Sequence, residues 1–357
     1  MTYLSGALAS LRKATKPEDV FGELKASDKG QRFEELKQKF NKLASMIHPD
    51  RHGGSKESHE AMSLLNVMRD RAEKRIEDDS WGKDSGVEIQ ATKLYKNVTA
   101  FETGDFSDLF IGETDGPRAV IKVVRDPKDR DFLHNEAKVL GKLWSLKDEK
   151  SVTLQNYLPR FIEQTRIKID GKEKLANILE AREGGFTLEQ VHARYPNGLD
   201  PRHVAWIWNR ILEVSAWVSR QGITNGAILP QHVIIFPKNH ECCLLGWPFS
   251  CTEGQSLKSI STGYEAYYPI EVFREKEKPA TPAIDIYMTA MCMVYLLGGS
   301  IETKQLPASV PSMFTGVIGA CLLKKFNRAT DPWEVHEQLV NQLRKTYGPR
   351  KFIELEM

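Results

Sequence analysis

The sequence predicts a multidomain chain, in which an all-α helical hairpin is followed by a larger α+β domain. Apolar residues recur at steps of three and four along two early segments, and a short loop joins these segments. From about Val87 the pattern changes to alternating strands and then to long helices. At 357 residues the chain has room for two domains, since single domains usually run to about 100–200 residues.

The first predicted helix has one apolar face, made by Phe33, Leu36, Phe40, Leu43 and Ile47. The tripeptide His48-Pro49-Asp50 ends this helix, because proline disfavours helical geometry in the residue before it. A second amphipathic pattern runs over residues 58–76, after the loop at 51–55. Two such helices joined by a short loop form an antiparallel hairpin that buries both apolar faces.

Composition and charge give no argument for a nucleic-acid or membrane partner. The chain has 50 basic and 48 acidic residues, a formal net charge of +2, and its basic residues are scattered. The longest apolar run, near residues 286–297, is shorter than the roughly 20 residues that span a bilayer, so we expect a buried helix there. Residues 1–13 do not have the pattern of a signal peptide.

Metal binding and disulfides are also not predicted. The five cysteines include no C-x-x-C pair, which leaves zinc unsupported and favours a reducing compartment. The histidines His48, His52 and His59 lie close in sequence, but no cysteine or acidic pair completes a metal site with them. We therefore expect a cytoplasmic protein without a metal site.

The residues around His48-Pro49-Asp50 resemble the J-domain family, over residues 19–76. The tripeptide alone is a weak signal, but its place at the end of an amphipathic helix, before a loop and a second such helix, is specific. The resemblance implies docking on a DnaK-type chaperone ATPase and stimulation of its ATP hydrolysis. The implied binding residues are His48, Pro49 and Asp50, with the basic residues Lys37, Lys39 and Lys42 facing an acidic groove. The alternative is a simple helix-ending turn beside a solvated face.

The residues from 87 to 347 resemble a protein kinase in the order and spacing of their motifs. Gly104 stands at the position of the Gly-rich loop, Lys122 ends a strand-like A-V-I-K, and Glu136 lies on the next helix. The resemblance implies a bilobal α+β protein-kinase-like fold. We accordingly expect a J-domain-like helical domain at residues 1–80, a linker at 81–90 and a kinase-like domain at 91–348. Its N-lobe would cover about residues 91–180 and its C-lobe about 181–348.

Part of the machinery for phosphoryl transfer is present. The transfer requires a lysine on the phosphates and a glutamate that holds this lysine. Lys122 and Glu136 can supply this pair, and with Gly104 they are the candidate nucleotide-binding residues. The resemblance also implies two structural roles, in which Asp285 braces the catalytic loop and Arg328 pairs with Glu271. The alternative for Lys122 and Glu136 is a surface lysine and an ordinary helix glutamate.

The remaining catalytic positions depart from the kinase family. Where kinases have the H-R-D triplet, this chain has Asn225, Gly226 and Ala227, and Ala227 cannot accept a hydrogen bond from a substrate hydroxyl. His232 stands in place of the magnesium-binding Asn, and Gly246 in place of the D-F-G aspartate. Losing the metal ligands should raise the barrier by several kcal/mol. We expect His232 to be a hydrogen-bonded loop histidine, the alternative being a metal ligand or an acid/base group.

Three functions are compatible with these residues. The first is an adaptor, in which the J-domain recruits a chaperone ATPase and a pseudokinase domain selects an unknown client. The second is an atypical kinase, or another transferase on a kinase-like fold. The third is a sensor that binds ATP at Lys122 without turnover and without a normal magnesium site.

Overall fold

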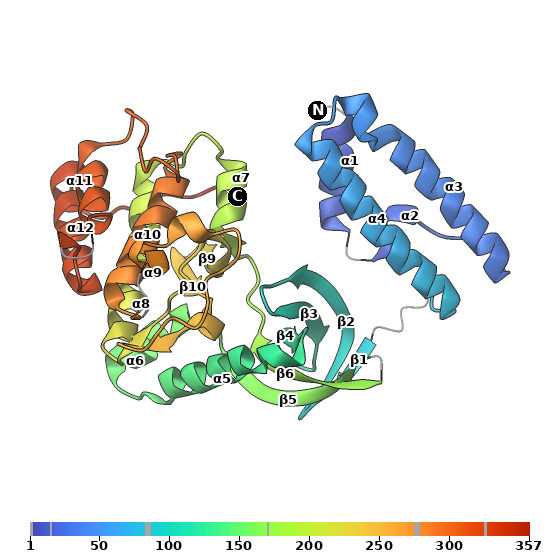
Figure 1. The fold of residues 1–357 in the computed structure, drawn as a ribbon, viewed down its shortest axis with the longest axis horizontal. Helices are drawn as coiled ribbons and strands as arrows, with labels where there is room; N and C mark the ends of the chain where they lie inside the picture. Colours follow the sequence, from blue (N-terminus) through green and yellow to red (C-terminus); the bar gives the residue numbers. More distant parts are fainter. Residues whose placement is uncertain (1–2, 15, 83–86, 170, 275–278, 325–326) are drawn as a thin grey trace. The chain divides into compact units, whose positions relative to one another are not determined.

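The computed structural model of the chain describes residues 3–14, 16–82, 87–169, 171–274, 279–324 and 327–357. Helices come first along the chain, followed by strands and then mainly by helices (Figure 1). Two compact units divide the chain, residues 1–102 with 109–119, and residues 103–108 with 120–357. The domain boundaries expected at residues 80, 90 and 348 stay predictions. Residues 83–86 of the expected linker lie outside the described residues, and its last part, Val87–Gln90, forms strand β1.

The N-terminal helices share one apolar core. Helices α3 (Lys29–Ile47) and α4 (Lys56–Glu77) pack against each other and form the predicted hairpin. Helices α1 (Tyr3–Lys13) and α2 (Pro17–Phe21) also contact α4. Leu36 and Ile47 of α3, with Leu65 and Ile76 of α4, are almost fully buried between the helices. The all-α character of this region is therefore confirmed.

Helix α1 was not predicted from the sequence, although it completes this core. Its buried residues Leu4, Leu8 and Leu11 follow the spacing of one helical face. Three leucines in an 11-residue segment are a weak pattern on their own. The helix is stable here because α4 offers an apolar surface on which it packs.

A six-stranded sheet follows, with the strand order β1-β2-β3-β4-β6-β5. After β1, its strands are β2 (Leu94–Thr103), β3 (Ser107–Glu113), β4 (Ala119–Val124), β5 (Phe161–Ile169) and β6 (Lys172–Glu180). Helix α5 (Arg130–Ser145) packs on β5 and β6. In β4 the residues Ala119, Ile121 and Val123 are buried, and the intervening Lys122 is only partly exposed. This alternation directs the lysine to the opposite face of the sheet from the apolar residues.

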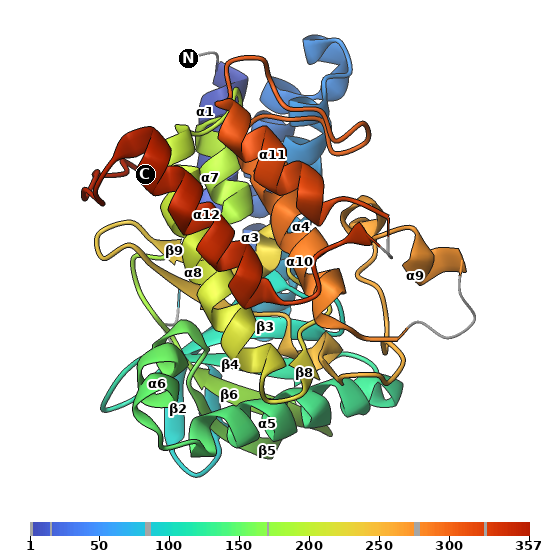
Figure 2. The ribbon, with the colours of Figure 1, turned by 90° about the vertical axis from the view of Figure 1, so that its left-hand side faces the viewer.

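The rest of the chain is mainly helical around short strands. Its helices are α6 (Glu149–Leu154), α7 (Leu188–Arg194), α8 (Pro201–Ser219), α9 (Glu271–Arg274), α10 (Pro282–Leu296), α11 (Ser312–Cys321) and α12 (Pro332–Tyr347). Its strands are β7 (Phe186–Thr187), β8 (Ile223–Thr224), β9 (Val233–Phe236), β10 (Glu241–Leu244) and β11 (Cys251–Thr252). Helix α8 contacts both α10 and α12 (Figure 2).

The apolar run near residues 286–297 lies within and just beyond α10, which is buried along most of its length, as predicted. Among the described helices, none is both long and apolar enough to cross a membrane. All five cysteines are unpaired and buried. Burial raises the pKa of the Cys243 and Cys321 thiols to about 12, so these thiols stay protonated near neutral pH.

A buried ion pair ties the segment before α12 to α9. Arg328 Nη1 lies 2.7 Å from Glu271 Oε1, and the arginine side chain is only 2% exposed. The same guanidinium donates two further hydrogen bonds to the carbonyl of Leu323. The pair expected from motif order is therefore present, and its surroundings indicate a structural role.

We predict that Arg328→Leu lowers the free energy of unfolding by about 3–5 kcal/mol, because it leaves the Glu271 carboxylate without its buried partner. Urea unfolding followed by circular dichroism measures the loss. The matched control is Arg166→Leu, which breaks an exposed pair with Glu173 and should change stability by less than about 1 kcal/mol. Equal losses in the two variants would contradict a structural role for the Arg328 pair.

Candidate functional site

The tip of the α3–α4 hairpin displays His48, Pro49 and Asp50. Helix α3 ends at Ile47, and Pro49 begins a short 3-10 turn over Pro49–His52. His48 Nδ1 accepts a hydrogen bond from the backbone N–H of Asp50 and lies 3.5 Å from its Oδ2. The side chains of His48 and Asp50 are 47% and 88% exposed. The imidazole and the carboxylate are thus held together by the turn and remain open to a partner.

Three further features hold this tip in its conformation. The ring nitrogen Nε2 of His52 is 2.8 Å from the carbonyl of Met46, in the last turn of α3. Gly53 closes the 3-10 turn with a φ of +61°, a left-handed conformation that favours glycine. Ser55 then caps α4 by accepting a hydrogen bond from the backbone N–H of Ser58.

The three lysines predicted to contact a chaperone lie in different environments. Lys37 and Lys42 are exposed on α3, and neither has an ion-pair partner among the residues that the structure describes. Lys39 instead donates to the carbonyls of Phe21 and Glu23 at 2.8 and 2.6 Å and pairs with Glu35. The Lys39 ammonium therefore makes its contacts inside the domain, at the end of α2. Of the three lysines, Lys37 and Lys42 are the ones whose charges are exposed on α3.

The kinase-like region contains the predicted Lys122–Glu136 pair. Lys122 Nζ of β4 lies 2.5 Å from Glu136 Oε1 of α5, and the glutamate side chain is 2% exposed. The other glutamate oxygen accepts a hydrogen bond from Asn177 Nδ2 of β6 at 2.9 Å. Asn177 was not predicted as a site residue, since a lone Asn in an apolar strand has no local motif. It satisfies the second oxygen and so stabilises the buried charge.

The loop that corresponds to the kinase catalytic loop is held by Asp285. Its two carboxylate oxygens accept hydrogen bonds from the backbone N–H groups of Asn225 and Gly226, each at 2.8 Å. The Asn225 side chain donates to the Leu245 carbonyl and accepts from the Ala227 N–H. Burial raises the pKa of Asp285 to about 7, and the two backbone donors act in the opposite direction. Asp285 therefore braces this loop, as its place in the motif order implied.

The substituted catalytic positions pack directly against one another. Gly246 has a φ of +80°, and a Cβ placed on it would lie 2.9 Å from the Ala227 carbonyl oxygen and 3.1 Å from His232 Nδ1. His232 Nδ1 donates to that same carbonyl at 2.9 Å, because a carbonyl can only accept. A carboxylate side chain at position 246 therefore does not fit this arrangement. The three substitutions form one packed unit, and His232 is a hydrogen-bonded loop histidine in it.

The segment Thr103–Asp108 contains the turn between β2 and β3, and we call it the cleft loop. It lies beside Gly246, Ala227 and His232. Asp105 Oδ1 accepts a hydrogen bond from Ser261 Oγ at 2.9 Å, and Asp105 Oδ2 lies 3.6 Å from His232 Nε2. Arg125 Nη2 donates to the carbonyls of Gly104 and Asp105. These contacts place a carboxylate beside His232, whose ring also experiences the charges of Lys122 and Glu136.

Three phenylalanine rings pack together at the cleft loop. Phe106 stacks on Phe132 of α5 with ring centroids 3.7 Å apart, and Phe249 lies 4.9 Å from Phe106. Asn135 Nδ2 of α5 reaches the backbone carbonyls of Pro248 and Ser250 at 3.1 and 2.7 Å. Helix α5, the cleft loop and the segment after Gly246 are thereby connected.

The region around Lys122, Asp105 and His232, which we call the cleft, keeps the lysine–glutamate pair, and His232 and Gly246 stand at the two positions that bind magnesium in kinases. Across the described residues, no three His, Cys, Asp or Glu side chains are grouped so that they could hold a metal ion. Burial lowers the pKa of His232, and the Ala227 carbonyl and Asp105 oppose this effect. A buried imidazole that already donates to a backbone carbonyl has little freedom to act as an acid or base.

Comparisons with known proteins found a likeness in sequence and a likeness in fold. No family model matches the sequence. The N-terminal J-domain region is 36% identical over 98 residues to a chaperone protein DnaJ from a Nitratiruptor species, covering 26% of each chain. The chain thus spans about a quarter of this relative. The crystal structure of the BubR1 kinase domain superposes with a TM-score of 0.56 and 15% identity, covering 74% of this chain and 85% of that one.

These two likenesses define the class of the protein. The chain joins a J-domain region, related to DnaJ in sequence, to a bilobal domain with the protein-kinase fold. At 15% identity the second likeness concerns the fold alone. The chemistry of the cleft must therefore be argued from the residues of this chain.

We predict that above about pH 7, where Asp285 is ionised, Asp285→Asn lowers stability by about 1–3 kcal/mol, because an amide offers one acceptor to two buried N–H donors. The pH dependence should change as well. Between about pH 4 and pH 7 the native chain retains a proton on Asp285 that the unfolded chain has released, so its stability falls as the pH rises through this window. Urea unfolding across this range measures both effects. A variant with the pH profile of the parent would contradict the assignment.

If ATP binds at Lys122, as one of the expected functions requires, we predict that Asp105→Ala increases its affinity at least several-fold, because the carboxylate beside His232 repels phosphates. Isothermal titration calorimetry, with magnesium and with EDTA, measures the change, and we expect little dependence on the metal. The control is Asp108→Ala, which removes another carboxylate of the cleft loop that lies 3.8 Å from Arg125. An equal gain in both variants, or none in either, would exclude a specific effect of Asp105.

Proposed function

We propose that this protein is a J-domain co-chaperone that recruits a DnaK-type chaperone ATPase and stimulates its ATP hydrolysis. The observation that carries the proposal is the exposed pair His48 and Asp50, which a rigid turn holds at the tip of the hairpin. The sequence likeness to a DnaJ protein in the same region supports it. The five unpaired cysteines favour a cytoplasmic location.

The geometry of the tip suits docking on another protein. A preorganised turn loses little conformational entropy when it binds, so more of the contact energy remains for affinity. Lys37 and Lys42 extend the positive surface along α3 and can pair with an acidic groove. Lys39 contributes by holding α2 in place and is not expected to contact the partner.

For the kinase-like domain we propose a binding or scaffolding role without phosphoryl transfer. The packing of Gly246 against Ala227 and His232 supports this, since it leaves no space for a metal-binding carboxylate at position 246. A kinase fold that lacks these ligands still provides a large, stable surface for a client protein. The client itself is not indicated by the residues of the cleft.

A second candidate role for the same domain is an ATP sensor without turnover. One observation favours it: the partly exposed Lys122 is held by the buried Glu136, whose second oxygen accepts a hydrogen bond from Asn177. Such a network is costly to maintain unless it is satisfied, and a nucleotide phosphate is a suitable partner for the lysine. This sensor would lack an ordinary magnesium site.

The experiment that tests the co-chaperone role is the steady-state ATPase rate of a DnaK-type chaperone with and without this protein. We expect stimulation by the parent chain and little or none by Asp50→Asn, because the amide removes the exposed negative charge at the tip. Lys37→Glu and Lys42→Glu should each weaken stimulation, since each reverses a charge on the docking face. Arg71→Glu reverses an exposed charge on α4 and serves as the control.

Two results would contradict the proposal. One is the absence of stimulation by a parent chain whose folding has been verified by circular dichroism. The other is equal stimulation by the parent and by Asp50→Asn, which would mean that the tip does not take part. In either case the kinase-like domain would become the main candidate for the function of the chain.

A further inference from the structure

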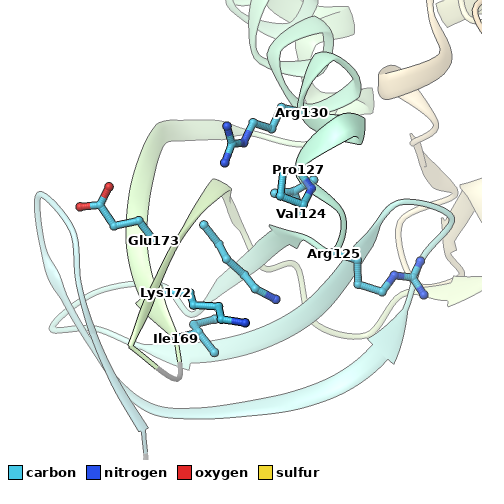
Figure 3. A pocket seen from close by; sticks show the side chains of 8 residues that line it. Val124, Arg125, Pro127, Arg130, Ile169, Lys172 and Glu173 are labelled. Carbon is cyan, nitrogen blue, oxygen red and sulfur yellow. The ribbon is translucent and has the colours of Figure 1, made fainter.

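A second candidate site lies away from the cleft, in a hollow of about 430 Å³ that we call the basic hollow (Figure 3). The β5–β6 hairpin forms one side of it, and the segment that connects β4 to α5 forms the other. Its apolar lining comes from Val124, Pro127 and Ile169, and its cationic lining includes Arg130, Lys172 and Lys174.

The positive charge of the basic hollow is not neutralised by the described part of the chain. Arg130, Lys172 and Lys174 make no ion pair with any residue that the structure describes. Lys172 and Lys174 are two residues apart in β6, so their side chains leave the strand on the same face. Three like charges around one hollow repel one another, and an anionic ligand would relieve that repulsion.

Two other charged residues line the hollow, and their charged groups contact residues outside it. Glu173 leaves β6 on the opposite face, points away from the hollow in Figure 3, and lies 3.6 Å from Arg166. Arg125 points away as well and donates to the carbonyls of Gly104 and Asp105 in the cleft loop. Among the described lining residues, the acidic one is thus directed outward, and the cations that remain available are Arg130, Lys172 and Lys174.

The apolar lining distinguishes the ligand from a simple anion. Val124 is only 2% exposed and lies at the base of the hollow, whereas Pro127 is exposed and Ile169 is half-buried. These two residues keep apolar surface that a phosphate ion would leave in contact with water. An apolar side chain on this surface would gain roughly 25 cal/mol for each Å² that it buries. Apolar contact and opposite charge are therefore both required from the ligand.

We propose that the basic hollow binds an acidic peptide segment of a client protein. One apolar side chain of the segment packs on Val124, Pro127 and Ile169, and the flanking carboxylates face Arg130, Lys172 and Lys174. This inference rests on the proposed function only in calling the partner a client. It concerns a surface separate from both the hairpin tip and the Lys122 cleft.

The test is binding of a fluorescein-labelled synthetic peptide, with one leucine between pairs of glutamates, to the full chain by fluorescence anisotropy. We expect saturable binding that weakens as salt is increased, because the contact is largely electrostatic and partly exposed. The double variant Lys172→Glu/Lys174→Glu should bind at least about tenfold more weakly. Lys138→Glu/Lys345→Glu reverses two exposed charges elsewhere and should bind like the parent. Circular dichroism verifies the folding of each variant.

Several outcomes would overturn the proposal. These are the absence of saturable binding, equal weakening by the control variant, or equal affinity for a peptide in which alanine replaces the leucine. Displacement of the peptide by inorganic phosphate, at a concentration comparable to that of the peptide, would instead indicate a simple anion site. No chaperone is present in this assay, so its result is independent of whether the hairpin tip stimulates an ATPase.

Discussion

The buried carboxylate of Asp285 is the interaction on which the arrangement of the cleft depends. It accepts hydrogen bonds from the backbone N–H groups of Asn225 and Gly226 and thereby determines the course of the following loop. That course brings the Ala227 carbonyl to His232, and His232 in turn lies beside Asp105. Removing a carboxylate from water is unfavourable unless both oxygens are satisfied, so the loop and the aspartate stabilise each other.

The substituted positions show how a kinase-like fold can keep its shape when other residues stand at the catalytic positions. The backbone of Gly246 packs against Ala227 and His232, and His232 donates a hydrogen bond to the Ala227 carbonyl. A larger side chain at position 246 would therefore collide with these two residues. The wider fold is stabilised by interactions that do not involve phosphate handling, such as the Arg328–Glu271 pair and the buried helix α10.

The hairpin and the cleft use their charged residues in opposite ways. At the hairpin tip, His48 and Asp50 are exposed and held by local backbone geometry. In the cleft, Glu136 and His232 are enclosed by contacts from several elements. An exposed, preorganised charge is suited to recognition, whereas an enclosed and satisfied charge mainly makes the structure rigid.

Apolar spacing predicted the hairpin and the buried helix near residue 290, and the resemblance to the kinase family implied the partners of Lys122, Asp285 and Arg328. The contacts of Asp105 could not be predicted in this way, because its partner Ser261 is 156 residues away and no motif connects them. Asn177 was missed for the same reason, 41 residues from Glu136. Lys39 was predicted to face a partner, and only the position of α2 shows that its ammonium donates a hydrogen bond to the Phe21 carbonyl.

The sequence by itself determined which chemical groups are absent. An alanine at position 227 cannot accept a hydrogen bond through its side chain, and a glycine at 246 cannot bind magnesium through one, in any conformation of the chain. Only the tertiary structure decided whether those positions are open or filled. That outcome depends on how closely Gly246 approaches Ala227 and His232, and on where the cleft loop places Asp105. Such distances arise from packing between residues far apart in sequence, which local patterns do not encode.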